Sequence, residues 1–373
     1  MTYVGTTPLS STLEELRSLP LTIDGVHFIG DKRNVFIGRY LHQEGFLGDL
    51  ARFLADWRSP SPVMQVQTSG STGTPQVIQV EKTRMANSAR ATCTALRLKS
   101  GMSALLAMPL RYIAARMVVV RALLAGLNLV PVPPSSSPFR TIEQRIDFAA
   151  LTPMQTYTSL ETPDTAERLR SVRCLLLGGG AINSSLAERL AEFPHEVWSS
   201  YGMTETLSHI ALRRLNGPNK SDWYTPLPGV SVSLTDDGTL SIHAPMVTAG
   251  DLVTTDLAEV DERGHFRILG RRDNIINSGG IKIQLEEVEE LLASVLKKPF
   301  CVSAVPDARL GEKLCLLHTG GEEPAVLDTL CRHVLPKYWV PRAYFAIDAV
   351  PLTETGKIRR KEARKMAEKL AQK

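Results

Sequence analysis

The sequence predicts an α/β protein with a large N-terminal domain and a small C-terminal domain. Its 373 residues exceed what one hydrophobic core usually organises. From residue 63 to residue 193, strand-like apolar runs alternate with helical stretches, which is the rhythm of layered α/β subdomains. After residue 230 short strands separated by Asp-Gly and Arg-Gly turns predict a small β subdomain, followed by an α+β segment. We therefore expect domains at 1–270 and 271–373.

The expected elements follow one another along the chain. Apolar residues spaced three and four apart predict short helices at 12–19 and 46–57, within a brief lead-in. The α/β layer is predicted to contain strands at 63–68, 77–80, 104–108, 129–133 and 172–177, with helices at 82–98, 117–125 and 184–193. The β subdomain is predicted at 230–234, 239–243, 252–254 and 265–269. The last domain is predicted to have helices at 285–296 and 325–334 and strands at 302–305, 314–318 and 343–347.

Composition excludes several classes of protein. Lys and Arg number 43 against 39 Asp and Glu, and a net charge of +4 is too small to imply a nucleic-acid partner. The five cysteines form no C-x-x-C pair, so neither a disulfide framework nor a zinc site is predicted. We read no signal peptide, and arginines and prolines interrupt the most apolar stretch, 102–134, so no membrane span is expected. The predicted location is the cytoplasm.

The segment from residue 68 to residue 76 is a loop rich in hydroxyls and glycine between two predicted strands. Backbone N–H groups and hydroxyls in such a loop can surround phosphate oxygens. The predicted phosphate-binding residues are Thr68, Ser69, Gly70, Ser71, Thr72 and Gly73. The loop is not a Walker A motif, because the Gly-Lys-Ser/Thr ending is missing and a strand follows. From composition alone, an ordinary polar hairpin is the alternative.

Six short motifs occur in order between residues 68 and 359. The loop itself has the form T-S-G-S-T-G-x-P, and the later segments are G-G-G-A from 178, Y-G-M-T-E from 201, T-D at 255, G-R-R-D-N from 270 and P-L-T-E-T-G-K-I-R from 351. In sequence and order they resemble the acyl-adenylate-forming superfamily, which contains acyl-CoA synthetases, luciferases and peptide-synthetase adenylation domains. Six motifs in order are far more specific than any single one.

The resemblance implies a role for each motif residue. It assigns nucleotide binding to Gly178, Gly179, Gly180, Tyr201, Asp256 and Arg271, catalysis to Thr204 and Lys357, Mg²⁺ binding to Glu205 and the hinge to Asp273. The residue types suit these roles, since an aromatic face fits adenine and a carboxylate accepts both ribose hydroxyls. Taken singly, each residue is better explained as a core aromatic, a turn cap or a surface charge. Only their combination favours the site.

The resemblance also implies a reaction in two steps. A carboxylic acid and MgATP give an acyl-adenylate and pyrophosphate; the small mobile domain then rotates, and a thiol, usually coenzyme A, displaces AMP. The expected cofactor is Mg²⁺, with ATP and coenzyme A as co-substrates. The expected partners are these small molecules, without nucleic acid or an integral membrane anchor, and a homodimer is possible.

The acid is indicated by the stretch from Met108 to Arg121, which resembles the o-succinylbenzoate–CoA ligases of menaquinone synthesis. Their substrate carries a second carboxylate that a buried cation can orient, and Arg121 matches the family's arginine. Ser208 and His209 are expected to line the same pocket. The phosphate loop begins early, at residue 68, so much of the usual N-terminal subdomain is expected to be absent.

Two departures and three alternatives remain. Gln76 replaces the usual lysine after the loop proline, and Tyr112 and Ala115 replace the usual His and Gly of the aromatic-acid stretch. A different aryl- or acyl-CoA ligase is therefore an alternative. A peptide-synthetase adenylation domain is less favoured, because no carrier domain is appended. A nucleotide-binding regulator that has lost catalysis would explain Gln76, but not the retained Glu205 and Lys357.

Overall fold

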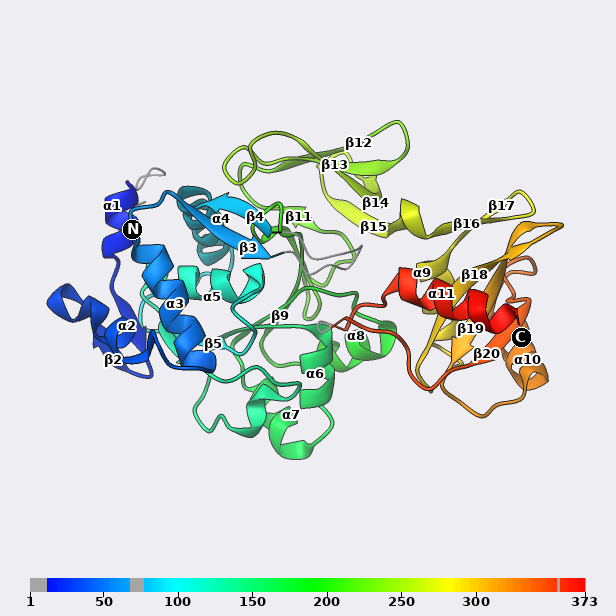
Figure 1. Ribbon diagram of the computed structural model, residues 1–373, viewed down its shortest axis with the longest axis horizontal. Helices are drawn as coiled ribbons and strands as arrows, with labels where there is room; N and C mark the ends of the chain where they lie inside the picture. The colour runs from blue at the N-terminus through cyan, green and yellow to red at the C-terminus, as the bar shows by residue number, and fades with distance from the viewer. Residues whose placement is uncertain (1–11, 68–76, 354–355, 373) are drawn as a thin grey trace.

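The computed structural model describes residues 12–67, 77–353 and 356–372. A nine-stranded sheet in the order β11-β10-β9-β8-β7-β5-β6-β1-β2 forms the centre of the large N-terminal part (Figure 1). Its strands are β1 (Leu21–Ile23), β2 (Val26–Phe28), β5 (Ser103–Leu106), β6 (Asn128–Pro131), β7 (Phe148–Leu151), β8 (Cys174–Leu177), β9 (Glu196–Gly202), β10 (His209–Arg214) and β11 (Thr225–Pro226). The strands from β9 to β1 pair in parallel, and β2, β10 and β11 add antiparallel edges.

Helices cover both faces of this sheet. They are α1 (Leu13–Ser18), α2 (Val35–Tyr40), α3 (Phe46–Arg58), α4 (Lys82–Ala95), α5 (Ile113–Ala125), α6 (Pro153–Ser159), α7 (Pro163–Arg170) and α8 (Ser184–Ala191), with 3₁₀ turns η1 (Gly30–Asn34) and η2 (Pro138–Arg140). Side chains of a strand alternate between the faces. In β8, Leu176 joins the core packed by α3, α4 and α5, whereas Leu175 and Leu177 join the core packed by α7 and α8. Burial on both faces explains the uninterrupted apolar sequence of β8.

The lead-in, the segment before residue 63, contains more than the two helices that its sequence predicts. A capping box starts α1, because Thr12 accepts from the Glu15 backbone and Glu15 accepts from the Thr12 backbone. The short strand β1 then pairs with β6, and β2 pairs with β1, so the lead-in extends the main sheet. Beside it, β3 (Val63–Gln67) and β4 (Val77–Glu81) form a separate antiparallel hairpin.

The small β subdomain is a four-stranded antiparallel sheet. Its strands are β12 (Ser231–Leu234), β13 (Thr239–His243), β14 (Leu252–Val260) and β15 (Phe266–Arg271), in that spatial order. Its core contains Ile242, Ala258 and Phe266, and it also includes Ile210 from β10 of the main sheet. This shared core fixes the small sheet against the carboxyl end of β9, where the site motifs lie.

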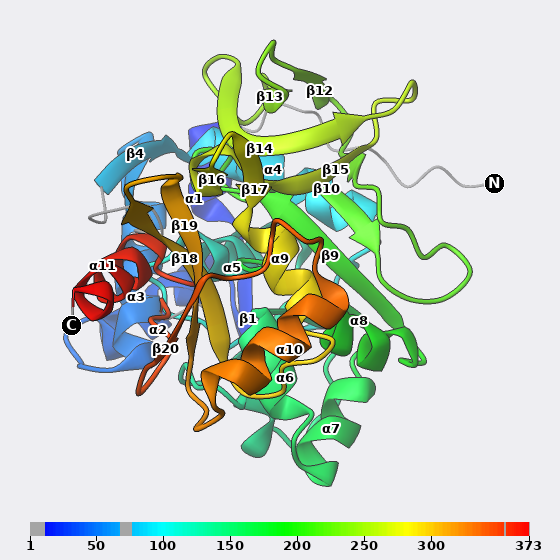
Figure 2. The same cartoon turned by 90° about the vertical axis from the view of Figure 1, so that its right-hand side faces the viewer.

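The last segment, residues 275–372, is called the C-terminal module here (Figure 2). It contains β16 (Ile275–Ser278), β17 (Ile281–Gln284), α9 (Leu285–Leu292), β18 (Phe300–Asp307), β19 (Gly311–His318), α10 (Pro324–Val334), β20 (Ala343–Ala346) and α11 (Arg360–Ala371), after the turn η3 (Arg272–Asn274). Its two apolar cores are separate from those of the sheets before it. This agrees with the expected boundary at residues 270 and 271, which stays a prediction. No helix in the described residues is long and apolar enough to cross a membrane.

The helix α11 was not predicted, since residues 357–373 look only like a basic tail. Ala363 and Ala367 are fully buried in one of the module's cores. At the start of the helix, Arg360 donates from both terminal nitrogens to Glu289, at 2.7 and 2.6 Å, and to the Val302 carbonyl at 3.2 Å. This fork between α11 and α9 fixes where the preceding chain, including Lys357, can lie.

Replacing Arg360 by Met should destabilise the C-terminal module by about 3–5 kcal/mol, because Glu289 is left in the interior without its partner. Amide hydrogen exchange in β18 of the full chain measures this locally. The double change Arg360→Met with Glu289→Met should recover most of the loss. The exposed Arg364, which forms ion pairs one turn later, provides the matched control, and Arg364→Met should cost less than about 1 kcal/mol. Equal losses at the two arginines would contradict the assigned role.

Candidate active site

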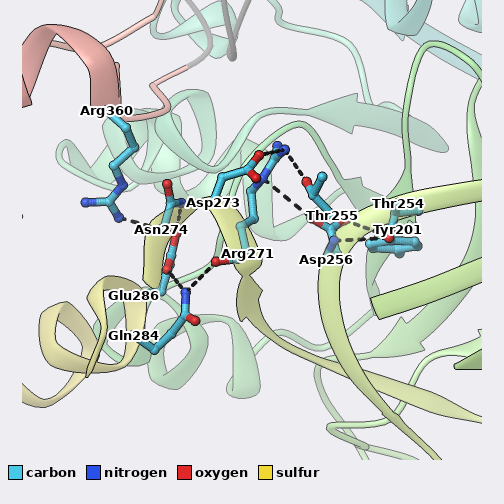
Figure 3. A network of polar contacts seen from close by, with 10 residues as sticks. All are labelled: Tyr201, Thr254, Thr255, Asp256, Arg271, Asp273, Asn274, Gln284, Glu286 and Arg360. Atoms are coloured by element: carbon cyan, nitrogen blue, oxygen red, sulfur yellow. Dashed lines mark hydrogen bonds and ion pairs between the residues drawn. The ribbon is translucent and has the colours of Figure 1, made fainter. Parts of the chain in front are cut away.

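Three strands bring the predicted nucleotide residues together. Tyr201 lies on β9, Asp256 on β14 and Arg271 at the end of β15. Asp256 and Arg271 are directly opposite each other in the antiparallel register, with Arg271 Nε 3.8 Å from Asp256 Oδ1. The Tyr201 hydroxyl donates to Asp256 Oδ2 at 2.7 Å (Figure 3). Burial and the adjacent Asp256 charge raise the pKa of Tyr201, so it remains a protonated donor.

The ring of Tyr201 is also part of the core. It meets Phe266 edge-on at 5.1 Å between centroids and lies 5.9 Å from the ring of Tyr224. Tyr201 therefore packs as a core aromatic and at the same time orients Asp256 through its hydroxyl. Its contact with adenine stays a prediction.

A continuous series of polar contacts leads from this site into the C-terminal module (Figure 3). The side chain of Arg271 bonds to Thr255 and, at 3.3 Å, to Asp273, the predicted hinge. Its carbonyl accepts from Gln284 Nε2 at 3.1 Å. Gln284 in turn bonds to Glu286, which also binds Asn274 and lies 3.6 Å from Arg360. Arg271 thus joins the nucleotide residues by its side chain and the module by its backbone.

The glycine turn after β8 closes tightly on β9. A Cβ atom at Gly178 would lie 2.6 Å from Ser200 Oγ, which donates to the Leu177 carbonyl. Gly179 has a φ of +80°, where other residues are strained. The turn therefore needs glycine for its own conformation, in addition to the predicted close approach of a nucleotide at Gly178, Gly179 and Gly180.

The loop after β9 presents Thr204 and Glu205. A Cβ atom at Gly202 would lie 2.2 Å from the Ser208 carbonyl oxygen, so the two ends of the loop approach closely. Inside the loop, the fully buried Thr206 hydroxyl accepts from the Met203 N–H at 3.0 Å and lies 2.7 Å from the Ser208 carbonyl. The loop is thus held from within, while Glu205 is exposed.

Glu205 is the predicted magnesium ligand in this loop. The part of the chain that the structure describes has no group of three His, Cys, Asp or Glu placed to hold a metal. The exposed carboxylate of Glu205 is a hard oxygen donor, which Mg²⁺ accepts alongside phosphate oxygens and water. The donor set therefore fits a magnesium ion brought by a nucleotide.

The charges of Asp256 and Arg271 act on Lys357 of the C-terminal module. Burial lowers its pKa, Asp256 opposes this shift and Arg271 adds to it. The neighbouring Gly356 has a φ of +83°, and a Cβ atom there would lie 2.9 Å from the side chain of Met154 on α6. The residue before Lys357 therefore lies against α6 of the N-terminal part, and the charges of Asp256 and Arg271 act on the Lys357 ammonium.

The predicted acid-binding residues meet in a buried polar cluster. Arg121 on α5 donates from Nη2 to Ser208 Oγ at 2.7 Å, and Ser208 Oγ lies 3.3 Å from His209 Nδ1. His209 Nε2 lies 3.0 Å from the hydroxyl of Thr92 on α4. We call Arg121, Ser208, His209 and Thr92 the Arg121 cluster. Burial lowers the pKa of Arg121 to about 10, and burial with the Arg121 charge holds the pKa of His209 well below its ordinary 6.5.

The phosphate loop cannot be compared with its prediction. Thr68, Ser69, Gly70, Ser71, Thr72 and Gly73 lie outside the described residues, as does Gln76. Gln67 and Val77, the ends of the loop, pair directly in the β3–β4 hairpin. Gln67 also forms a bridge with Tyr112, just before α5, which brings the start of the loop to the helix that carries Arg121.

Sequence reasoning missed three residues that shape the site. Thr92 holds His209, Thr206 holds the loop of Glu205, and Met154 packs against Gly356. For Thr206 a signal existed, because it directly follows the Y-G-M-T-E motif. For Thr92 and Met154 there was none, since their partners are distant in sequence.

Comparisons with known proteins identify the family of the chain. The family model described as "AMP-binding enzyme" matches residues 51–256. A 2-succinylbenzoate–CoA ligase of Bacillus mycoides is 27% identical over 343 residues, which cover 82% of this chain and 70% of the relative.

Two solved structures are similar to this chain in sequence and in fold. An acyl-CoA synthetase (AMP-forming)/AMP-acid ligase II-like protein of Dyadobacter fermentans is 34% identical, with a TM-score of 0.59, over 87% of this chain and 95% of that one. The o-succinylbenzoate CoA synthetase of Bacillus subtilis, solved with its acyl-adenylate intermediate, is 26% identical, with a TM-score of 0.68, over 80% and 68% of the two chains.

These findings confirm the predicted fold class and the predicted enzyme class, an AMP-forming acyl-CoA synthetase. The match of the family model covers more than half of the chain, and it includes Tyr201, Glu205 and Asp256. The chain belongs to the AMP-binding enzyme family.

Proposed function

We propose that the protein is an ATP-dependent acid–CoA ligase whose acid is o-succinylbenzoate. It adenylates one carboxylate of the acid with release of pyrophosphate, and then transfers the acyl group to coenzyme A with release of AMP. The names of the similar proteins from Bacillus mycoides and Bacillus subtilis support this acid. An aryl- or acyl-CoA ligase for another acid is the alternative within the same chemistry.

The buried charge of Arg121 is the observation that favours an acid with two carboxylates. The residue is 2% exposed, and among the described residues no carboxylate is found to act on its charge. Its Nε atom is buried without a hydrogen-bond partner in that part of the chain. A buried cation is costly unless an anion compensates it, and a guanidinium matches a carboxylate with two hydrogen bonds. A second carboxylate on the acid supplies that anion.

The residues around Asp256 and Arg271, called the nucleotide end here, are proposed to supply the groups that adenylation needs. Asp256 is held by Tyr201 and Arg271, and it is proposed to accept the ribose hydroxyls, with the Gly178 turn beside adenine. Glu205 would hold Mg²⁺, which neutralises phosphate charge when bound. Thr204, in the same loop, is proposed to contact the reacting groups.

Lys357 is proposed to stabilise the charge that develops when the acid attacks the nucleotide. The effect of the Asp256 and Arg271 charges on its pKa, together with the packing of the neighbouring Gly356 against Met154, supports this role. Thioester formation is proposed to use a second orientation, reached by rotation about Asp273, with 1–270 and 271–373 as the moving parts.

Pyrophosphate release with ATP, Mg²⁺ and a panel of acids tests the function. We expect o-succinylbenzoate to give the highest kcat/KM, with AMP and a thioester as products once coenzyme A is added. A higher kcat/KM for benzoate or a medium-chain fatty acid would reject the assigned acid. Nucleotide binding without pyrophosphate release for any acid would instead support the non-catalytic regulator.

Replacing Arg121 by Leu should lower kcat/KM for the diacid by an amount equivalent to about 2–5 kcal/mol, because the substrate carboxylate is then left unpaired at a buried position. Steady-state pyrophosphate release at varied acid concentration measures it, with most of the change in KM. Arg145, which is exposed, provides the control, and Arg145→Leu should leave KM unchanged. Wild-type KM in Arg121→Leu would make Arg121 a structural residue.

Replacing Lys357 by Ala should slow adenylate formation about 10²-fold or more, the scale expected when a preorganised charge-stabilising donor is removed. Single-turnover measurements of each half-reaction check this, and thioester formation from a supplied adenylate should barely change. Lys361 on the exposed side of α11 is the matched control. If Lys357→Ala slows both half-reactions equally, the proposed confinement of Lys357 to adenylation is wrong.

Gln76 stands where the resemblance places a lysine, so Gln76→Lys should speed adenylation or tighten MgATP. A cation beside the departing pyrophosphate stabilises charge in the transition state. The measurement is single-turnover adenylation at varied MgATP, with Gln76→Ala as the neutral comparison. A slower lysine variant would show that the loop is adapted to an amide.

A further inference from the structure

We propose that Thr92 and His209 are positioning residues for Arg121, and that their hydrogen-bond chain makes the pocket selective for acids with a second carboxylate. The inference rests on the proposed function, because it concerns the acid that Arg121 receives. Thr92 and His209 need not touch that acid; they act by holding Arg121 through Ser208.

The chain has a defined start at the backbone of α4. Thr92 Oγ1 lies 3.0 Å from the Ser88 carbonyl oxygen, which can only accept, so the Thr92 hydroxyl donates its single hydrogen there. The same oxygen lies 3.0 Å from His209 Nε2. Because the Thr92 hydrogen is already used, His209 must donate from Nε2. The structure therefore assigns the Nε2–H tautomer to His209.

The other side of the His209 ring is then an acceptor. Burial and the charge of Arg121 keep His209 neutral, so Nδ1 carries a lone pair. Arg121 has only donors, so Ser208 Oγ accepts from Arg121 Nη2 at 2.7 Å. The Ser208 hydroxyl is thus free to donate to His209 Nδ1, 3.3 Å away. Every hydrogen in the chain points the same way, from Arg121 to the Ser88 carbonyl.

The direction of these hydrogen bonds determines how the guanidinium of Arg121 is held. One terminal nitrogen of Arg121 is held by the protein, while its Nε is buried without a hydrogen-bond partner among the described residues. The chain joins the helices α4 and α5 to the start of β10, which is more than 80 residues further along the sequence. A guanidinium fixed at one nitrogen presents its remaining donors to a carboxylate in a set orientation, so less freedom is lost on binding.

A purely structural role for Thr92 and His209 makes a different prediction from a positioning role. Loss of a structural contact would lower activity with every acid in proportion to the protein that remains folded. Loss of a positioning contact should impair only acids whose second carboxylate uses Arg121. Comparison of a diacid with its monoacids therefore separates the two roles.

The test uses Thr92→Val, which keeps the shape of the side chain but removes the hydroxyl. The acids are o-succinylbenzoate and the two monoacids obtained by replacing either of its carboxylates with hydrogen. In the full-length variant, kcat/KM for the diacid should fall about tenfold, mainly through KM, as expected when one buried hydrogen bond is lost. For the better monoacid it should change less than twofold. Thr92→Ser should restore the diacid preference.

Thr94, exposed on the same helix, gives the matched control, and Thr94→Val should leave both values unchanged. An equal fall for diacid and monoacid in Thr92→Val would make Thr92 structural. Unchanged kinetics would overturn its role altogether. Activity with the monoacid also shows that the variant is folded.

A second measurement needs no substrate. Nitrogen-15 NMR of the imidazoles should show His209 as the Nε2–H tautomer, its signal identified among the eight histidines by its loss in His209→Gln. Thr92→Val should weaken that preference. An Nδ1–H tautomer in the unmodified protein would refute the direction of the chain. If the unmodified enzyme does not prefer the diacid, the proposed function fails, and the tautomer still reports on the chain by itself.

Discussion

The pairing of Asp256 with Arg271 across β14 and β15 is the interaction on which the site depends. Asp256 accepts a hydrogen bond from the hydroxyl of Tyr201 on the main sheet. The carbonyl of Arg271 accepts a hydrogen bond from Gln284 of the C-terminal module. Three parts of the fold therefore meet at two opposed residues of one small sheet. In a partly buried setting such contacts polarise and support one another. Removing either charge would affect the nucleotide end and the position of the module together.

The two ends of the proposed substrate meet different electrostatic surroundings. At the nucleotide end, Arg271 lies between the carboxylates of Asp256 and Asp273, so its charge is compensated within the protein. At the acyl end, Arg121 is buried and its neighbours in the cluster are neutral. A buried cation at this position lowers the stability of the fold unless the charge of a ligand compensates it. The first arrangement suits a nucleotide that binds and is released, and the second suits the proposed selection of an acid by its charge.

The sequence predicted the fold class and several residues that the structure brings together, but not the contacts between them. Uninterrupted apolar runs such as β8 were predictable because burial on both faces leaves no polar position. The helix α11 was missed because its buried face consists of small residues, Ala363 and Ala367, between charged ones. Asp256 and Arg271 were both predicted, since their motifs are local. Thr92 could not be, because its partner His209 lies 117 positions away and only the packing of α4 against β10 brings them together.

If Asp273 is the hinge, as proposed, its position decides which residues a rotation can affect. Asp256 and Arg271 both precede Asp273, so their pairing can survive a turn about that residue. Lys357 follows it, and its loop is held against the N-terminal part by the packing of Gly356 on Met154, a contact between a glycine and a flexible side chain. Arg360 meanwhile keeps α11 fixed to α9 within the module. A rotation would therefore carry Lys357 away as part of a rigid unit and leave the Asp256 and Arg271 pair in place.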